Sequence, residues 1–153
     1  MTATAGQQTD TFIVFGVAGT AYALSSRDVQ HMEMVEGVTR VPNAPAHVDG
    51  VVFSRGQVVP AVNLRARFGF ERAPYDLRSR LIVVQSSGRH VGLIADDARE
   101  FVRISPTAIQ PPQEAMAATG NDYVSGIASL EGRLVVILDL DRLMAFSEPL
   151  PTA

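Results

Sequence analysis

The amino-acid sequence predicts an all-β protein made of two small, five-stranded β-barrels with only short helices. Apolar residues mostly alternate with polar ones, or form short runs bounded by glycine and proline, which is typical of strands. The strand pattern recurs in the same order in the two halves of the chain, so one β module is used twice. Small barrels suit five short strands per copy because a closed barrel leaves no exposed strand edge.

The repeat is clearest between segments 47–68 and 123–144, which align without a gap at an offset of 76 residues. A second, weaker repeat aligns segment 12–29 with segment 81–98 at an offset of 69. A module of about 70 residues lies near the lower size limit for independent folding. We therefore expect the two copies to share a core or a tight interface.

Ten strands are predicted from these patterns. Those of the first copy are Phe12–Val17, Tyr22–Leu24, Met32–Val35, Val48–Phe53 and Val58–Val62. Those of the second copy are Leu81–Gln85, His90–Ile94, Phe101–Ile104, Val124–Ala128 and Leu134–Leu138. Glycine adopts positive φ easily, which places hairpin turns at Gly19, Gly56, Gly88 and Gly132. Short helices are predicted at Asn63–Phe68 and Asp139–Phe146, where Asn or Asp can cap the first turn, and at Gln113–Thr119.

The domain organisation follows from the repeat. Residues 11–146 are expected to form a single domain, with barrel segments 11–69 and 80–146 and with exchange of strands between the barrels left open. Residues 1–10 are polar and predicted to be a disordered N-terminal tail, and residues 147–153 a loose C-terminal tail.

The amino-acid composition argues against several classes of function. The formal net charge of the 153 residues is −3 and no basic cluster occurs, which argues against nucleic-acid binding. The absence of cysteine excludes disulfides and thiol chemistry. No apolar run of 18 or more residues and no signal-peptide pattern is present, so a cytoplasmic protein without direct membrane insertion is expected.

The sequence offers no pattern for an enzyme. An aspartic-protease arrangement needs one carboxylate from each copy, but Asp49-Gly50 is matched by Ser125-Gly126. The histidines lie in different segments, and no neighbouring serine has the pattern of an activated nucleophile. The acidic pairs at 96–97 and 139/141 are interpreted as turn and cap residues, and no phosphate-binding loop occurs. No catalytic residues, cofactor or metal are expected.

The segment VTRVPNAPAHVDGVVFSRGQVVPAVNLRARFG, residues 38–69, resembles the CheW-like family of bacterial chemosensory adaptors. The resemblance extends over residues 11–146, and its matching positions are Pro42, Pro45, Gly50, Arg55, Gly56, Pro60, Asn63 and Leu64. Two departures stand out: Phe53-Ser54 replaces the usual Asn-Leu before Arg-Gly, and Asp96-Asp97-Ala98 replaces an Asp-x-Val pattern. The resemblance implies two intertwined five-stranded SH3-like barrels.

The resemblance also implies a non-enzymatic adaptor. Such a protein would couple the cytoplasmic helical tip of a chemoreceptor, a methyl-accepting chemotaxis protein, to the regulatory domain of a CheA-type histidine kinase. The alternative is a stand-alone SH3-like scaffold that is not coupled to a kinase. A gene neighbourhood containing a receptor and a kinase would separate the two readings.

Candidate contact residues follow from the resemblance. The expected receptor-binding groove consists of Val29, Met32, Val38 and Arg55. The expected kinase-facing residues are Val91, Leu93, Val124 and Leu134. Residues expected to shape turns and backbone are Gly50, Gly56, Pro60, Gly126 and Gly132. Two other readings stay open: Arg55 as a turn residue that pairs with its own chain, and the three groove apolar residues as ordinary core.

Overall fold

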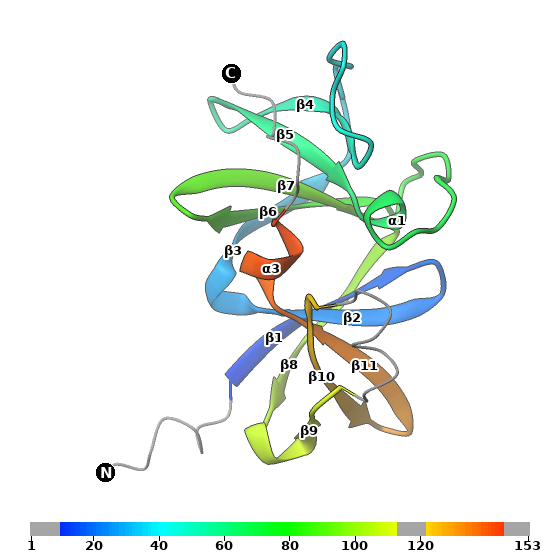
Figure 1. Ribbon diagram of the computed structural model, residues 1–153, viewed down its shortest axis with the longest axis vertical. Helices are drawn as coiled ribbons and strands as arrows, with labels where there is room; N and C mark the ends of the chain where they lie inside the picture. The colour runs from blue at the N-terminus through cyan, green and yellow to red at the C-terminus, as the bar shows by residue number, and fades with distance from the viewer. Residues whose placement is uncertain (1–9, 113–121, 146–153) are drawn as a thin grey trace.

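Strands dominate the computed structural model, which describes residues 10–112 and 122–145 (Figure 1). They make up 57% of the structure, which confirms the all-β prediction. The strands are β1 (Asp10–Val17), β2 (Thr20–Ser25), β3 (Val29–Met34), β4 (Val48–Ser54), β5 (Gln57–Asn63), β6 (Arg80–Ser86), β7 (Arg89–Ala95), β8 (Asp97–Ile104), β9 (Ile109–Gln110), β10 (Val124–Leu130) and β11 (Arg133–Leu138). Within these described ranges the α-helices are α1 (Leu64–Arg67) and α3 (Leu140–Leu143).

The strands form two curved sheets, and the two sequence copies do not each form their own. The five-stranded sheet has the order β3-β6-β7-β5-β4 and draws on residues 29–95. The six-stranded sheet has the order β8-β1-β2-β11-β10-β9, so the N-terminal hairpin joins strands from residues 97–138. The hairpins join through parallel pairs, β11 with β2 and β5 with β7, while every other pairing is antiparallel.

Four hairpin turns lie at the glycines where the sequence predicted them. In each turn the residue before the glycine also has positive φ, which is the backbone of a type I′ turn. This turn matches the right-handed twist of the flanking strands. The four pairs are Ala18-Gly19, Arg55-Gly56, Ser87-Gly88 and Glu131-Gly132.

Among the described strands, neither sheet closes into a barrel through backbone hydrogen bonds, so the prediction of closed barrels is wrong in that respect. In the six-stranded sheet the edge strands β8 and β9 follow one another in the chain, joined by a 3-10 turn at Pro106–Ala108. β9 has only two residues, and Pro111 and Pro112 follow it. Proline has no N–H to donate, so the sixth strand cannot extend and complete the closure.

In the five-stranded sheet a single residue continues the pairing beyond the edge strand β4. Thr39 and Val51 exchange two backbone hydrogen bonds of 2.8 Å each. Gly37, with φ of 63°, bends the chain between β3 and Thr39. The gap between the two sheet edges is therefore bridged by side chains and not by a continuous backbone ladder.

Each copy ends in one turn of α-helix, as predicted, although both helices are shorter than the predicted ranges. The side chain of Asn63 accepts a hydrogen bond from the N–H of Ala66, which caps α1. Asp139 caps α3 in the same way by accepting from the N–H of Arg142. These helices direct leucine side chains into the space between the sheets.

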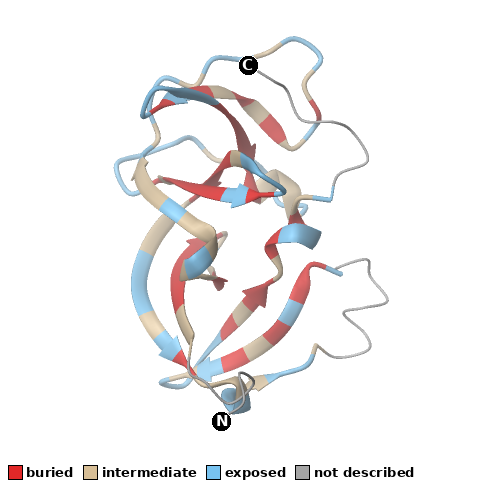
Figure 2. Ribbon diagram, turned by 90° about the vertical axis from the view of Figure 1, so that its left-hand side faces the viewer, coloured by how far each residue is buried: buried red, intermediate tan, exposed pale blue. Residues whose placement is uncertain are grey.

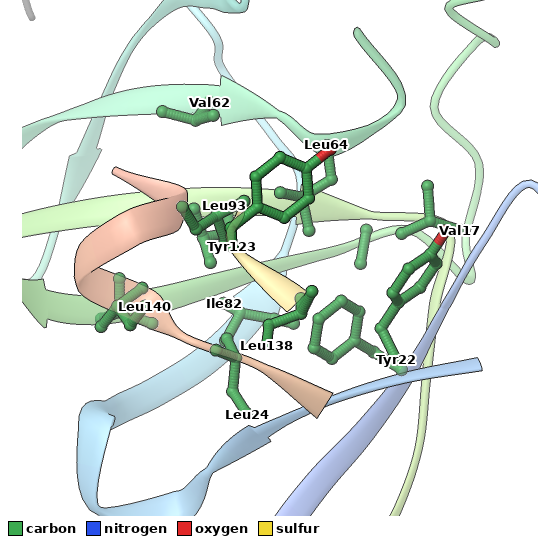
Figure 3. Packing of buried hydrophobic residues seen from close by; sticks show 14 of the residues in the cluster. Val17, Tyr22, Leu24, Val62, Leu64, Ile82, Leu93, Tyr123, Leu138 and Leu140 are labelled. Carbon is green, nitrogen blue, oxygen red and sulfur yellow. The ribbon is translucent and has the colours of Figure 1, made fainter. Parts of the chain in front are cut away.

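Three clusters of buried side chains form the core. One lies inside the six-stranded sheet and contains Phe12, Val14 and Ile137 among others. A second lies inside the five-stranded sheet around Leu81 and Val83. The largest lies between the sheets, where residues from β2, β5, β6, β7, β11 and both helices point toward one another (Figure 3). Because this central cluster takes residues from both copies, the two halves share one core.

The alternation of buried and exposed residues differs between strands (Figure 2). β10 alternates along most of its length, as expected for a strand with one solvent face. β6 and β7 each contain a run of buried residues, because one face packs on the central cluster and the other on the cluster inside the five-stranded sheet.

Several expectations fall partly or wholly outside the described residues. These are the helix at 113–119 and the C-terminal tail at 147–153. Of the tail expected at 1–10, only Asp10 is described, and it begins β1. In the described ranges, no helix has the length and apolar character needed to cross a membrane.

Candidate interaction surfaces

The turn between β4 and β5 presents a cation and two apolar side chains to solvent. Arg55 is exposed and has φ of 47°, so the turn directs it away from the sheet. Phe53 and Val58, which face each other across the hairpin, are 71% and 40% exposed. Arginine next to exposed aromatic and aliphatic surface is a combination that protein interfaces favour.

Three polar side chains hold the base of this turn. Ser54 is 4% exposed, and its Oγ donates a hydrogen bond to Glu33 Oε2 at 2.6 Å. His31 Nε2 lies 2.7 Å from the same carboxylate oxygen and 3.1 Å from the serine Oγ. Burial alone would raise the pKa of Glu33, but the hydrogen bonds from Ser54 and His31 and the nearby charges of His31 and Arg55 lower it. This polar latch, Ser54–His31–Glu33, bridges the open edges of β3 and β4.

The latch contains the side chains of a Ser-His-Glu set but not the geometry of a catalytic triad. A triad needs one imidazole nitrogen on the serine and the other on the carboxylate. Here the same nitrogen, Nε2 of His31, faces both partners, and Ser54 already donates to Glu33. The sequence did not reveal this contact, because Ser54 lies 23 residues from His31.

The equivalent positions in the other sheet hold apolar residues. The strand registers place Val102 where the five-stranded sheet has Glu33, and the repeat places Leu130 at the position of Ser54. Val102 and Leu130 both pack on the core of the six-stranded sheet. The side chains at these two positions are therefore polar in one sheet and apolar in the other.

The four predicted groove residues do not form one cluster. Val29 and Met32 are half-buried against the central core, whereas Val38 packs on the core inside the five-stranded sheet. Arg55 lies at the hairpin tip and is linked to β3 through its charge interaction with Glu33.

The four predicted kinase-facing residues also separate. Val91, Leu93 and Val124 are buried in the central core. Leu134 is 66% exposed on β11, at the position that Val58 occupies in the first copy. Of these four side chains, only Leu134 is open to a partner.

Two of the predicted structural glycines allow a neighbouring segment to approach closely. A Cβ on Gly50, whose φ is 151°, would lie 2.0 Å from the carbonyl oxygen of Thr39. A Cβ on Gly126 would lie 2.4 Å from a methyl group of Ile109. Each glycine marks a register shift in its hairpin, so the same backbone device recurs in both copies.

Pro60 and the turn glycines have other local environments. Pro60 faces Val51 across the β4–β5 hairpin and immediately precedes Ala61, where pairing with β7 begins. The backbone groups of Val51 bond outward to Thr39, so the missing proline N–H removes no bond between the two strands. Gly56 and Gly132 lie in open turns with φ of 83° and 81°.

Asp49 lies at the centre of a second polar network that sequence reasoning missed. Its carboxylate accepts hydrogen bonds from Asn63 Nδ2 at 2.8 Å, from Arg72 Nε at 2.8 Å and from the hydroxyl of Tyr75. Burial would raise the pKa of Asp49, but these three donors and the charge of Arg72 lower it. The network fixes the connector after α1 against the start of β4. Within the described ranges, no group of three or more His, Asp or Glu residues could hold a metal ion.

Comparisons with known proteins agree with this architecture. The sequence profile of the CheW-like domain matches residues 11–148. The chain is 30% identical to a chemotaxis protein CheW of Rhizobium meliloti over 136 residues, covering 89% of this chain and 88% of that protein. It is 28% identical to the chemotaxis protein CheW of Klebsiella aerogenes over 145 residues, covering 95% and 86%.

A solved structure shares the fold. The scaffolding protein TtCheW from Thermoanaerobacter tengcongensis superimposes with a TM-score of 0.81 at 27% identity, covering 94% of this chain and 98% of that one. With the two-sheet architecture, the match of the family profile over residues 11–148 establishes that the chain belongs to the CheW-like family.

Proposed function

We propose that this protein couples the helical tip of a chemoreceptor to the regulatory domain of a CheA-type histidine kinase, in the cytoplasm. CheW-like proteins are scaffolding adaptors and not enzymes, and the chain has a corresponding adaptor role in chemotaxis signalling. Coupling of this kind is a difference in binding energy between signalling states, transmitted through two interfaces on one body.

The observation that carries the proposal is the β4–β5 turn. Arg55 stands exposed between Phe53 and Val58, and the polar latch fixes the base of the turn. A preformed surface loses little conformational entropy when a partner binds. Val29 and Met32 on β3 pack half-buried against the central core, apart from Arg55, and we propose that their exposed portions contact the same receptor helix.

The second interface is assigned to the equivalent hairpin of the other copy. Leu134 is exposed on β11, and the turn of that hairpin carries Glu131 where the first copy carries Arg55. The two turns thus share a backbone but carry opposite charges at this one position. This difference supports a division of labour, with the receptor at the first hairpin and the kinase at the second.

The test is Arg55→Ala, with affinities for receptor and kinase measured separately. A central arginine of an interface typically contributes roughly 2 kcal/mol on truncation. Receptor binding should therefore weaken by about thirtyfold, with little change in kinase binding. Glu131→Ala is the matched control for receptor binding, because it removes a charged side chain from the equivalent turn of the other hairpin, where φ is 50°.

Leu134→Ala should have the reciprocal effect, weakening kinase binding and leaving receptor binding intact. Equal losses for both partners in a folded Arg55→Ala variant would refute the division of labour. Absence of binding to either partner by the wild-type protein would instead favour a scaffold that is not coupled to a kinase.

A further inference from the structure

A pocket of about 680 Å³ lies at the opposite end of the β4–β5 hairpin from Arg55. It is formed between segment 40–49 and the connector at 72–75, which emerge on the same side of the hairpin (Figure 1). β4 has seven residues, which separate the pocket from the turn by roughly 20 Å. The volume falls in the range of about 300–1,000 Å³ that is typical of ligand sites.

The walls of the pocket combine small apolar side chains with one aromatic ring. Val48 and Asn63 are buried at its base. Tyr75 is 40% exposed, and its hydroxyl donates a hydrogen bond to Asp49. The apolar walls are Val41, Ala44, Pro45, Ala46, Ala73 and Pro74.

The rim of the pocket is basic. Two hydrogen bonds hold Arg72 in place: its Nε donates to Asp49 Oδ1 at 2.8 Å, and its Nη2 donates to the carbonyl oxygen of Ala46 at 2.5 Å. Its side chain is nonetheless 48% exposed. Arg40 is also exposed, and in the part of the chain that the structure describes it takes part in none of the ion pairs. The carboxylate of Asp49 already accepts hydrogen bonds from three donors. With Arg40 and Arg72 against this single carboxylate, the lining of the pocket has a net positive charge.

The sequence repeat supplies an internal comparison. At an offset of 76, Ser125 and Asp139 replace Asp49 and Asn63, and they line a pocket of about 330 Å³ in the other half. That pocket is acidic: its one arginine, Arg27, accompanies Asp10, Asp28, Asp139 and Asp141. Burial and the charge of Asp141 raise the pKa of Asp28. The two pockets share these two equivalent positions and differ in the sign of the charge around them.

We propose that the basic pocket binds an acidic segment of a partner protein in extended conformation. A glutamate or aspartate would lie between Arg40 and Arg72, since a guanidinium suits the planar geometry of a carboxylate. Proline or small aliphatic residues beside it would pack on Tyr75 and the apolar walls, as in other sites that take extended, proline-bearing peptides. This site does not depend on the receptor and kinase assignments.

The experiment is an NMR titration of the ¹⁵N-labelled full chain with the peptide acetyl-Ala-Pro-Glu-Pro-Ala-amide. Proline keeps this probe extended. Shifts should centre on the backbone amides of Arg40, Ala46, Arg72 and Tyr75. An analogue with Gln in place of Glu should bind about fivefold more weakly, which corresponds to about 1 kcal/mol for an exposed ion pair. An analogue with Lys should not bind at this site.

Two charge reversals complete the design. Arg40→Glu should abolish binding of the Glu peptide and leave the hydrogen bonds of Asp49 in place, because these come from Asn63, Arg72 and Tyr75. Arg27→Glu, the same reversal at the acidic pocket, should leave binding unchanged. Equal affinity for the Glu and Gln peptides, shifts centred on the acidic pocket, persistence of binding in Arg40→Glu, or no shifts at millimolar peptide would each overturn the proposal.

Discussion

Arg65 and Asp96 form a two-point ion pair that ties the five-stranded sheet to the six-stranded sheet. Nε of Arg65 lies 2.9 Å from Oδ1 of Asp96, and Nη2 lies 2.7 Å from Oδ2. The same carboxylate accepts a hydrogen bond from the N–H of Ala18, in the turn of the N-terminal hairpin, at 2.8 Å. The backbone N–H of Asp96 in turn donates to the carbonyl of Gly16 at 2.9 Å.

Replacing Asp96 by alanine should destabilise the protein by about 2–3 kcal/mol, because a partly buried guanidinium and the N–H of Ala18 both lose their acceptor. The free energy of unfolding from chemical denaturation measures this. Asp97→Ala is the control, since Asp97 pairs with Arg99 on the same strand at 3.1 Å. That change should cost no more than about 1 kcal/mol. Similar losses for both variants would contradict a special role for Asp96.

Stability should fall in acid. Burial acts to raise the pKa of Asp96, Asp49 and Glu33, but their hydrogen-bond donors and neighbouring cations lower all three pKa values in the folded state. The unfolded chain then takes up protons first, near its ordinary carboxyl pKa of about 4. The stabilisation is complete above that pH and is lost as the pH falls through the lower, folded pKa values.

Denaturation at pH 7 and pH 3 tests this expectation. The Asp96→Asn variant should show a smaller difference in unfolding free energy between the two pH values than the wild-type protein, because it lacks one of the three linked groups. An unchanged difference would show that Asp96 does not contribute to the acid sensitivity.

Gly50→Ala should be among the costly single changes, at roughly 3 kcal/mol, because a Cβ there meets the backbone oxygen of Thr39 and the φ is unfavourable for alanine. Gly132→Ala separates the two causes. Its φ is also positive, but nothing lies within 4 Å of the added Cβ, so strain alone should cost about 1 kcal/mol. Equal denaturation midpoints for the two variants would rule out a steric role for Thr39.

The polar latch can be tested by copying the other sheet. Ser54→Leu and Glu33→Val should each destabilise the protein, because each leaves a polar partner facing an apolar side chain. The double variant places apolar side chains at both positions, as Leu130 and Val102 do in the other sheet. Its cost should be smaller than the sum of the single costs by about 1 kcal/mol, measured as a double-mutant cycle. Strict additivity would show that the two side chains act independently.

Most strands could be predicted from the sequence because their apolar pattern and their turn residues are local in the chain. The strand predicted at Val48–Phe53 is observed at Val48–Ser54, and the strand predicted at Leu81–Gln85 is observed at Arg80–Ser86. The start of β8 was missed by four residues, since Asp97 and the polar residues after it show no apolar alternation. β9 was missed because two residues before a proline pair carry no periodicity.

The candidate surfaces were harder to predict for a different reason. Alternation distinguishes a buried face from an exposed one, but β7 is covered on both faces. Val91 and Leu93 therefore could not be assigned to the surface or the core from their spacing. The polar latch and the Asp49 network depend on contacts between distant segments, which no local pattern encodes.

The exchange of hairpins has a consequence for the order in which the chain can assemble during synthesis. All strands of the five-stranded sheet are present once residue 95 has been made, and this sheet can form from contiguous chain. The β1–β2 hairpin, although translated first, lacks its neighbours β8 and β11 until residues 97–138 have emerged. Such long sequence separation slows folding. The β1–β2 hairpin therefore waits longer for its neighbouring strands than any strand of the five-stranded sheet does.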